Sequence, residues 1–293
     1  MKNKLSLFAV PYVGWMSIFV VAPIIIMVVY AFSTAAGDFT LENFARMGTY
    51  TAAFTRSFKL AIIATLIALL IGYPVSYMLS KEGPQVQRIA MVLIMLPMWM
   101  NFLLRTYSWM SILENNGLLN QLFQQIGLID LYNQIAMHFA SDPAAYVPID
   151  HFQMIGTQGA VVLGMVYNYL PFMILPIYSV LVKLDHSLIE AARDLGASSV
   201  QVFRKVILPL SLPGVLSGIT MVFVPSVSTF AISRLLGGGT QMMLGDLIEQ
   251  QFLGGAYNPQ LGAAIALVMM AIVVVCMLVM NRFGDGEEQA VML

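Results

Sequence analysis

Polar and aromatic side chains within long apolar stretches are the residues of this 293-residue chain best suited to chemistry. Polar groups in lipid usually face a bundle interior or water, so binding and passing a solute is the chemistry they suit. Some of them also suit the aromatic belt at a membrane surface or hydrogen bonds within their own helices. We predict that they line a transport pathway: Trp99, Asn101, Arg105, Tyr107, Tyr167, Asn168, Tyr169, Ser226 and Thr229.

Helical spacing groups some of these residues on common faces. Asn101 and Arg105 are four residues apart in one apolar stretch, and Ser226, Thr229 and Ser233 follow the same rule in another. Residues three or four apart lie on the same side of a helix. Each set therefore predicts a polar stripe along one face of its span.

Motifs for bond-making chemistry are absent from the sequence. The segment 237–240, Gly-Gly-Gly-Thr, lacks the lysine of a phosphate-binding loop and predicts a turn. There is no H-E-x-x-H motif, and Ser217 and Ser226 have no histidine or lysine base in the same apolar stretch. We therefore predict no catalytic residue and no metal site, which disfavours an intramembrane hydrolase.

The composition places the chain in a lipid bilayer. Hydrophobic residues make up 59% of the sequence and charged residues only 10%, against roughly 25% charged residues in an ordinary soluble domain. The net charge is −1 and there is a single cysteine, Cys276. These values exclude a water-soluble enzyme, a nucleic-acid-binding protein and a disulfide framework.

Six apolar segments are long enough to cross a membrane as helices, which need about 20 residues. The first follows Lys2 and Lys4, but it is too long for a cleavable signal peptide and is expected to be retained. The fold class predicted is therefore an all-α integral membrane protein with one transmembrane domain over 1–293. Its expected spans are 8–32, 58–80, 88–110, 156–182, 210–232 and 261–281.

The basic residues predict the orientation, because Lys and Arg collect on the cytoplasmic side. We expect both termini to be cytoplasmic, since the outer loop 111–155 then contains no Lys or Arg. Of the 14 basic residues, four then lie on the outer side of the membrane and Arg105 lies within a span. The other nine lie inside: Lys2, Lys4, Lys81, Arg88, Lys183, Arg193, Arg204, Lys205 and Arg282.

Proline occurs in five of the six spans, at Pro23, Pro74 and Pro97 and as pairs in the next two. Because proline removes a backbone hydrogen bond, these spans are expected to bend, and bent helices suit a bundle around a cavity. The last span has no proline and is expected to be a structural or partner-packing helix.

The inner segment 183–209 predicts two short helices joined by a glycine. Ser187 with Glu190, and Ser198 with Gln201, have the capping-box spacing, and Gly196 between them supplies a left-handed stop. The second helix is expected to end at Pro209. Such a unit suits docking into a groove of a soluble partner, or rests equally well on lipid head groups.

The spacing within this segment matches a known pattern. Glu190-Ala191-Ala192 is followed after three residues by Gly196, and after nine more by 206–209, Val-Ile-Leu-Pro, with valine where the pattern has isoleucine. It resembles the EAA loop of bacterial ABC importer permeases, which inserts into the ATP-binding subunit. The resemblance implies ATPase-coupling roles for Glu190, Ala191, Ala192, Asp194, Gly196, Leu208 and Pro209.

Further motifs extend the resemblance over most of the chain: 72–74 Gly-Tyr-Pro, 97–101 Pro-Met-Trp-Met-Asn, 105–107 Arg-Thr-Tyr and 170–173 Leu-Pro-Phe-Met. Together they resemble the B-type permeases of spermidine/putrescine importers. This implies a type I importer fold in the bacterial cytoplasmic membrane and a heterodimer with a second permease. It also implies an external binding protein and two ATPase subunits that hold the ATP and Mg²⁺, with no cofactor in this chain.

The outer segment 245–252 predicts a short amphipathic helix between glycine turns. It suits a surface cap on the bundle. With the family resemblance, it also suits part of the platform for the binding protein, where Asp246 and Glu249 would meet an arriving cation.

A polyamine substrate, which is a polycation, conflicts with the distribution of charge along the chain. None of the 15 acidic residues lies in a predicted span, and Arg105 repels cations. Aromatic faces supply cation–π attraction of about 0.5–2 kcal/mol each, and carboxylates can come from the second permease. A same-fold permease for an iron chelate, amino acid or sugar is the main alternative. A secondary transporter would show inverted repeats and ionisable groups at mid-membrane. Arg105 is the one residue of the predicted spans that meets this description.

Overall fold

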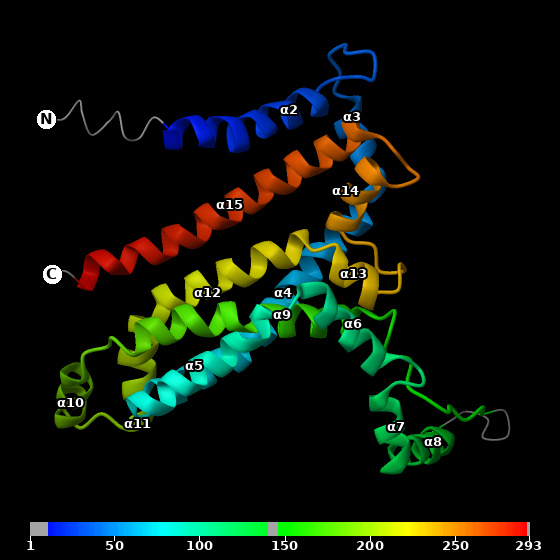
Figure 1. The fold of residues 1–293 in the computed structure, drawn as a ribbon. Helices are drawn as coiled ribbons and strands as arrows, with labels where there is room; N and C mark the ends of the chain where they lie inside the picture. The colour runs from blue at the N-terminus through cyan, green and yellow to red at the C-terminus, as the bar shows by residue number, and fades with distance from the viewer. Residues whose placement is uncertain (1–10, 140–145, 292–293) are drawn as a thin grey trace, which may run out of the picture.

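The computed structural model describes residues 11–139 and 146–291, and these form an all-helical bundle without named strands (Figure 1). The first helix runs over Pro11–Ala31 with a wider π turn at η1 (Ser17–Val21). The other elements are α2 (Ala22–Ala31), α3 (Glu42–Arg46), η2 (Met47–Tyr50), α4 (Thr51–Ser80), α5 (Pro84–Trp99), α6 (Phe102–Leu113), α7 (Leu118–Gln125), α8 (Leu128–Phe139), α9 (Gln158–Leu181), α10 (His186–Asp194), α11 (Ser199–Val202), η3 (Phe203–Ile207), α12 (Leu208–Ser228), α13 (Ala231–Leu236), α14 (Leu244–Leu253) and α15 (Pro259–Val291).

Five helices among the described residues are long and apolar enough to cross a membrane, and a sixth span exists if a bent pair counts as one. The bent pair is Pro84–Trp99 with Phe102–Gln125, and the bend is 89°. The sequence predicts one span over 88–110 with a bend at its proline; the structure divides this segment into two helices, because the chain is extended at Met100. An extended residue interrupts the i to i−4 hydrogen bonds that a continuous helix needs.

Helices α4, α9 and α12 form the centre of the bundle, and glycines let their backbones approach closely. A Cβ on Gly214 of α12 would lie 2.8 Å from the Pro176 carbonyl oxygen of α9. A Cβ on Gly72 of α4 would lie 2.9 Å from Met173 Cγ, and one on Gly218 of α12 would lie 2.8 Å from Met173 Sδ. Small residues serve this purpose in membrane bundles, where the lipid supplies no hydrophobic driving force.

Prolines within these three central helices do not break them. Pro74, Pro171, Pro176 and Pro213 all lie inside continuous helices. Side chains also link these helices to one another; Ser76 of α4, for example, donates to the Ile174 carbonyl of α9 at 3.1 Å. The two breaks in the spans come a few residues after Pro97 and Pro225 instead.

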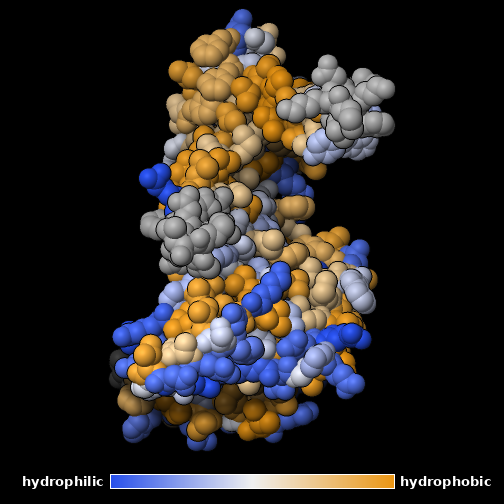
Figure 2. All heavy atoms as spheres, turned by 90° about the vertical axis from the view of Figure 1, so that its left-hand side faces the viewer, coloured by the Kyte–Doolittle hydropathy of each residue, from blue (hydrophilic) through white to orange (hydrophobic). Residues whose placement is uncertain are grey.

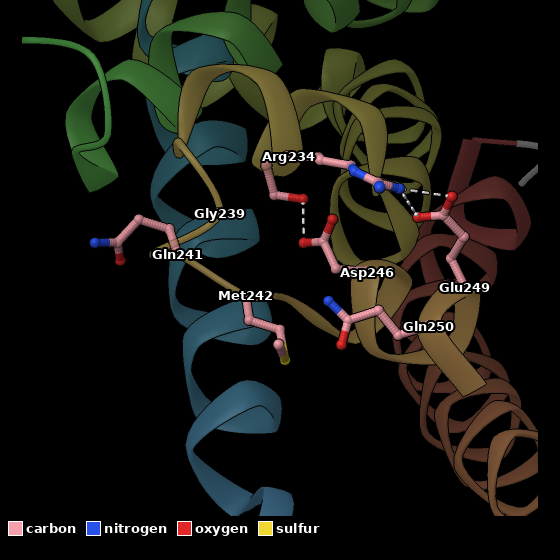
Figure 3. Close-up of a pocket in the computed structure, with 8 residues that line it drawn as sticks. Arg234, Gly239, Gln241, Met242, Asp246, Glu249 and Gln250 are labelled. Atoms are coloured by element: carbon pink, nitrogen blue, oxygen red, sulfur yellow. Dashed lines mark hydrogen bonds and ion pairs between the residues drawn. The ribbon is translucent and has the colours of Figure 1, made fainter. Parts of the chain in front are cut away.

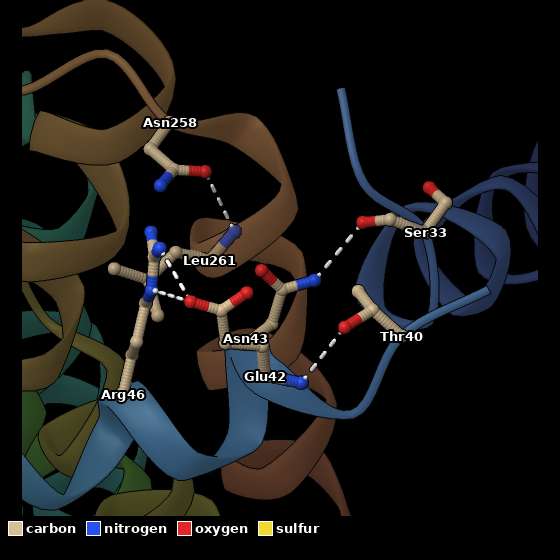
Figure 4. A network of polar contacts seen from close by, with 7 residues as sticks. All are labelled: Ser33, Thr40, Glu42, Asn43, Arg46, Asn258 and Leu261. Carbon is tan, nitrogen blue, oxygen red and sulfur yellow. Dashed lines mark hydrogen bonds and ion pairs between the residues drawn. The ribbon is translucent and has the colours of Figure 1, made fainter. Parts of the chain in front are cut away.

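The first helix and α15 form an outer layer beside this centre (Figure 1). Ala31 of α2 packs against Ala263 and Ala264 of α15. The turn that follows α2 is fixed by buried Asn43, whose Nδ2 donates to the Ala31 carbonyl at 3.0 Å and to the Ser33 carbonyl at 3.0 Å; the second bond is visible in Figure 4. The packing of α15 against α2, α12 and α14 agrees with the structural role expected for the last span.

One end of the bundle carries α10 and α11, and the start of the first helix and the end of α15 lie at the same end (Figure 1). This arrangement agrees with the predicted topology, in which segment 183–209 lies on the side of both termini. The opposite end carries α3, α13 and α14, and α6 leads from it to α7 and α8. Part of the predicted outer loop, 140–145, lies outside the described residues.

Candidate coupling surface and transport pathway

Helix α10 begins differently from the sequence prediction. Asp185 is its N-cap, and the Asp185 Oδ1 accepts a hydrogen bond of 2.9 Å from the Ser187 backbone N–H. This bond to the charged form holds the pKa of Asp185 below its usual range. The predicted capping box of Ser187 and Glu190 is therefore wrong, because an aspartate two residues earlier supplies the cap.

The elbow after α10 matches the prediction. Gly196 has a φ of 81° and donates its N–H to the Arg193 carbonyl at 2.8 Å. Ser198 and Gln201 form the predicted capping box, in which each side chain bonds the other residue's backbone N–H, at 3.4 Å and 2.8 Å. Only glycine adopts such a φ at low cost, so this residue fixes the angle between the two helices.

The second helix does not end at Pro209. Residues Ser199–Ser228 form one continuous helix, with a π turn at η3 and Pro209 in the first turn of α12. A proline has no N–H to donate, and the wider π turn supports the backbone through a bond from the Leu208 N–H to the Phe203 carbonyl. The helix pair is therefore joined rigidly to a membrane span.

The outer face of α10 presents the residues of the family motif. Glu190, Ala191, Asp194 and Leu195 are exposed, and Leu195 has 89% of its surface free. Figure 2 views this end of the molecule, where hydrophilic residues gather around apolar ones over α10 and α11. Of the other predicted residues, Gly196 and Leu208 are exposed, while Ala192 and Pro209 are half-buried. An exposed leucine beside charged side chains is suited to protein docking.

The inner face of the pair packs on the bundle through aromatic rings. Phe203 meets Tyr73 and Tyr77 of α4 edge-on, with ring centroids 5.9 and 5.4 Å apart. The Tyr73 and Ser211 hydroxyls lie 2.9 Å apart and link α4 to α12. Sequence reasoning missed these contacts, although the spacing of Tyr73 and Tyr77 by one helical turn was a usable signal.

The break between α5 and α6 lies among the predicted pathway residues. Asn101 caps α6, and its Oδ1 accepts hydrogen bonds from the N–H groups of Leu103 at 2.8 Å and Leu104 at 3.4 Å. Trp99 and Tyr107 are exposed on either side of the break, Trp99 by 73%. Asn101 is thus a helix cap rather than a member of a stripe on one straight span.

A second break separates α12 from α13. Thr229 is extended, so Ser226, Thr229 and Ser233 do not share one helix face, and that prediction is wrong. Buried Ser226 donates to the Val222 carbonyl at 2.7 Å, and Ser233 bonds Asp246 instead. The structure gives these serines local structural bonds, one of the alternatives that the sequence left open.

The remaining predicted pathway residues lie on α6 and α9. Arg105 is buried, with 8% of its surface exposed, and among the described residues none accepts a hydrogen bond from its Nε or Nη1. Asn168 is buried and donates to the Gly164 carbonyl at 2.8 Å. Tyr169 lies beside Thr229 and within electrostatic reach of Arg105, while Tyr167 packs edge-on against Trp109.

The predicted outer helix exists as α14, but it is partly buried rather than a surface cap. Asp246 is only 6% exposed, and its Oδ2 accepts from Ser233 Oγ at 2.5 Å (Figure 3) and from the Met243 N–H at 3.0 Å. Burial raises the pKa of this carboxyl above its usual value. A carboxyl buried in this way is not available to an external protein.

Glu249 is the accessible acid of α14, and Arg234 of α13 binds both of its carboxylate oxygens, at 2.8 and 2.7 Å (Figure 3). A pair of this kind at a surface contributes little to stability but fixes the position of the side chains. The pairing was missed from the sequence because 15 residues separate the partners and no periodic pattern links them.

The described residues hold no group of three or more potential metal ligands. The helices, the two broken spans and the helix pair at one end define a transmembrane permease-like subunit rather than a catalytic domain. Residues 68–286 match the family described as binding-protein-dependent transport system inner membrane component, and the chain belongs to this family.

The comparisons with individual proteins agree with this family. The chain is 34% identical over 281 residues to the spermidine/putrescine transport system permease protein PotB of Escherichia coli K12, covering 93% of this chain and 95% of the relative. It resembles a solved bacterial ABC transporter involved in import of the acidic polysaccharide alginate, with a TM-score of 0.76, 16% identity and coverage of 97% and 96%. The alginate transporter in complex with a periplasmic protein gives a TM-score of 0.71, 17% identity and coverage of 96% and 94%. The fold is therefore that of type I ABC importer permeases, as predicted.

Proposed function

We propose that this chain is a permease subunit of an ATP-driven spermidine/putrescine importer and forms half of its translocation pathway. The observation that carries the proposal is the 34% identity to PotB, which extends over nearly the whole of both chains. The helix pair with an exposed Glu190, Ala191 and Leu195 supports it, since this surface suits docking to a soluble partner.

The partners follow from the same proposal. A second permease completes the pathway, two ATP-binding subunits hold ATP and Mg²⁺ and dock on segment 183–209, and an external protein delivers the polyamine. The assembly lies in the bacterial cytoplasmic membrane. Support comes from the alginate transporter of the same fold, whose structure includes a ligand-bound periplasmic protein.

The mechanism is a rigid-body movement driven from the helix pair. Closure of the ATPases on nucleotide displaces α10, and the Gly196 elbow passes that displacement to α11. Because α11, η3 and α12 are one helix, and Phe203 packs on Tyr73 and Tyr77, the movement reaches α12 and α4 directly. Alternating access then needs two arrangements of these spans, whose balance nucleotide and substrate shift.

Reconstitution with the three kinds of partner tests the proposal. We expect ATP-dependent uptake of labelled spermidine or putrescine into proteoliposomes, and none when the ATPase or the binding protein is omitted. Uptake of an iron chelate, amino acid or sugar in place of polyamines would identify another permease of this fold. Uptake driven by an ion gradient without ATP would identify a secondary transporter.

A further inference from the structure

Helices α7 and α8 form an arm beside the bundle, and hydrogen bonds within the arm hold it together (Figure 1). Buried Asn120 of α7 donates to the Phe152 carbonyl at 3.0 Å and accepts from the Phe152 N–H at 2.9 Å. Asn133 of α8 bonds the carbonyl and the N–H of Ile149 in the same way, at 2.8 and 2.9 Å. Each helix is therefore fixed to the returning chain, and the arm presents a preformed surface.

Each helix of the arm exposes a stripe of large apolar side chains. The members recur every three or four residues, which places them on one side of a helix. Among the described residues, no helix other than α6 packs extensively on this pair. An uncovered apolar surface of this kind marks contact with a protein or with a membrane. The stripes consist of Leu118, Leu122 and Ile126 on and just after α7, and of Leu128, Leu131, Ile135 and Phe139 on α8.

The bend between α5 and α6 directs the arm along the plane of the membrane. Helix α5 has 16 residues and is therefore about 24 Å long, against about 30 Å for the hydrocarbon core. It starts at the end of the bundle that carries α10 and α11, so its other end lies near the outer boundary of the core (Figure 1). The segment Phe102–Gln125, which contains α6 and α7, lies at 89° to α5. Because spans run close to the membrane normal, α7 follows the outer surface of the bilayer.

The polar side chains of the arm favour lipid as the contact of these stripes. Helix α7 has no charged residue, and the exposed polar groups beside its stripe are amides, such as Gln121 and Gln124. Helix α8 has one acid, Asp130, and the segment 111–155 has no Lys or Arg. Helices with one apolar and one polar side lie in the head-group layer of a membrane. A soluble partner that comes and goes would leave the stripes in water between encounters, whereas lipid adjoins a membrane span at all times.

We propose that α7 and α8 lie in the head-group layer of the outer leaflet, with both stripes directed toward the acyl chains. Burial of apolar area supplies the attraction, because the arm has no basic residue to bind anionic head groups. The arm thereby holds the break at Met100 at a fixed depth in the membrane. This placement requires neither substrate nor ATP, so it stands or falls separately from the proposed function.

Fluorescence quenching in phosphatidylcholine vesicles tests the placement, with the full chain reconstituted alone and together with a second permease. In a Cys276→Ala background, a fluorescent label is attached to Leu122→Cys or Ile135→Cys, one on each stripe. We expect lipid that carries a nitroxide on its acyl chain to quench these labels at least about twofold more than aqueous iodide does. Gln124→Cys and Asp130→Cys are the matched controls, because both residues are exposed on other sides of the same helices; iodide should quench them more strongly.

The other outcomes overturn the proposal in distinguishable ways. Stronger quenching of the stripe labels by iodide would place the arm in water. Protection from both quenchers that appears only with the second permease would assign the stripes to a contact between subunits. Lipid quenching should persist at high salt and without anionic lipid, and a dependence on either would contradict an apolar attraction. Thermal unfolding in detergent identifies a labelled variant that has not folded, and the label on the other helix then decides.

Discussion

The Ser233 hydroxyl on α13 donates a 2.5 Å hydrogen bond to the buried carboxyl of Asp246 on α14. This bond links the two short helices that follow the break at Thr229, and the Met243 N–H adds a second donor to the same oxygen. The other carboxyl oxygen, Oδ1, is buried and has no partner among the described residues. When the Asp246 carboxyl is charged, hydrogen-bond donors of the described residues therefore reach only one of its two oxygens.

This geometry predicts the pH dependence of stability. Burial is the largest influence on Asp246 and raises the pKa of its carboxyl in the folded state. Proton binding therefore stabilises the folded chain. This stabilisation is fully present below the unfolded pKa of about 4, and it is lost as the pH rises through the folded pKa. Asp246→Asn keeps an acceptor oxygen and carries no charge. We expect this variant to gain thermal stability over the wild type as the pH rises from about 4 to 8. Identical pH profiles of the two proteins would contradict the assignment.

Asp246→Leu provides the matched control for that experiment. It also removes the charge, but it leaves the Met243 N–H without its acceptor, while the Ser233 hydroxyl keeps the Phe230 carbonyl at 2.9 Å. Each unsatisfied buried group costs about 1–3 kcal/mol, so the leucine variant should unfold at a lower temperature than the asparagine variant at every pH.

The packing of α12 on α9 gives a second prediction. A Cβ on Gly214 would lie 2.8 Å from the Pro176 carbonyl oxygen and 3.1 Å from the Ile177 Cα, which are backbone atoms that cannot move alone. We expect Gly214→Ala to destabilise the chain by about 1–3 kcal/mol in thermal unfolding in detergent. Gly14→Ala is the control, because Gly14 also lies in a long apolar helix but has nothing within 4 Å of its added Cβ. Equal stability of the two variants would show that the helices separate easily.

Local patterns of the sequence were sufficient for some of this structure. The Gly196 stop and the Ser198–Gln201 capping box depend on residues within one turn, so spacing alone predicts them. The apolar stretches likewise predict where long helices form, because each must satisfy its own backbone in lipid.

Contacts between distant segments could not be predicted in the same way. The extended residues Met100 and Thr229 lie within apolar stretches that hydropathy treats as continuous, and no glycine marks either break. The bond of Ser233 to Asp246 depends on the turn between α13 and α14, whose path periodicity does not specify. The outer helix was therefore predicted correctly as an element, but its buried face was not.

The helix pair predicts a third result, on coupling. Glu190→Arg reverses an exposed charge on α10, and Gly196→Val forces a branched residue into a φ of 81°. We expect both variants to reduce polyamine uptake per ATP hydrolysed at least about tenfold in proteoliposomes, with the bundle still folded, because the docking face or the elbow is altered.

Two matched controls accompany the coupling variants. Glu82→Arg reverses an exposed charge in the turn between α4 and α5, outside the helix pair. Gly37→Val forces the same kind of strain at a φ of 93° in the turn after α2, at the opposite end of the bundle. Both are expected to keep coupling close to the wild-type value. Normal coupling in Glu190→Arg and Gly196→Val would exclude α10 as the coupling element.

The fourth prediction concerns Trp99, which is exposed at the end of α5, next to the break between α5 and α6. If its ring holds an ammonium group of the substrate, Trp99→Ala removes a cation–π attraction of about 0.5–2 kcal/mol, and uptake at low polyamine concentration should fall roughly 2- to 30-fold. Trp99→Phe keeps an aromatic face and should retain most of the activity. Trp15→Ala is the control, because Trp15 is also exposed but lies on the first helix against Phe19. Unchanged uptake in Trp99→Ala, or a loss that Trp99→Phe does not moderate, would remove this residue from the pathway.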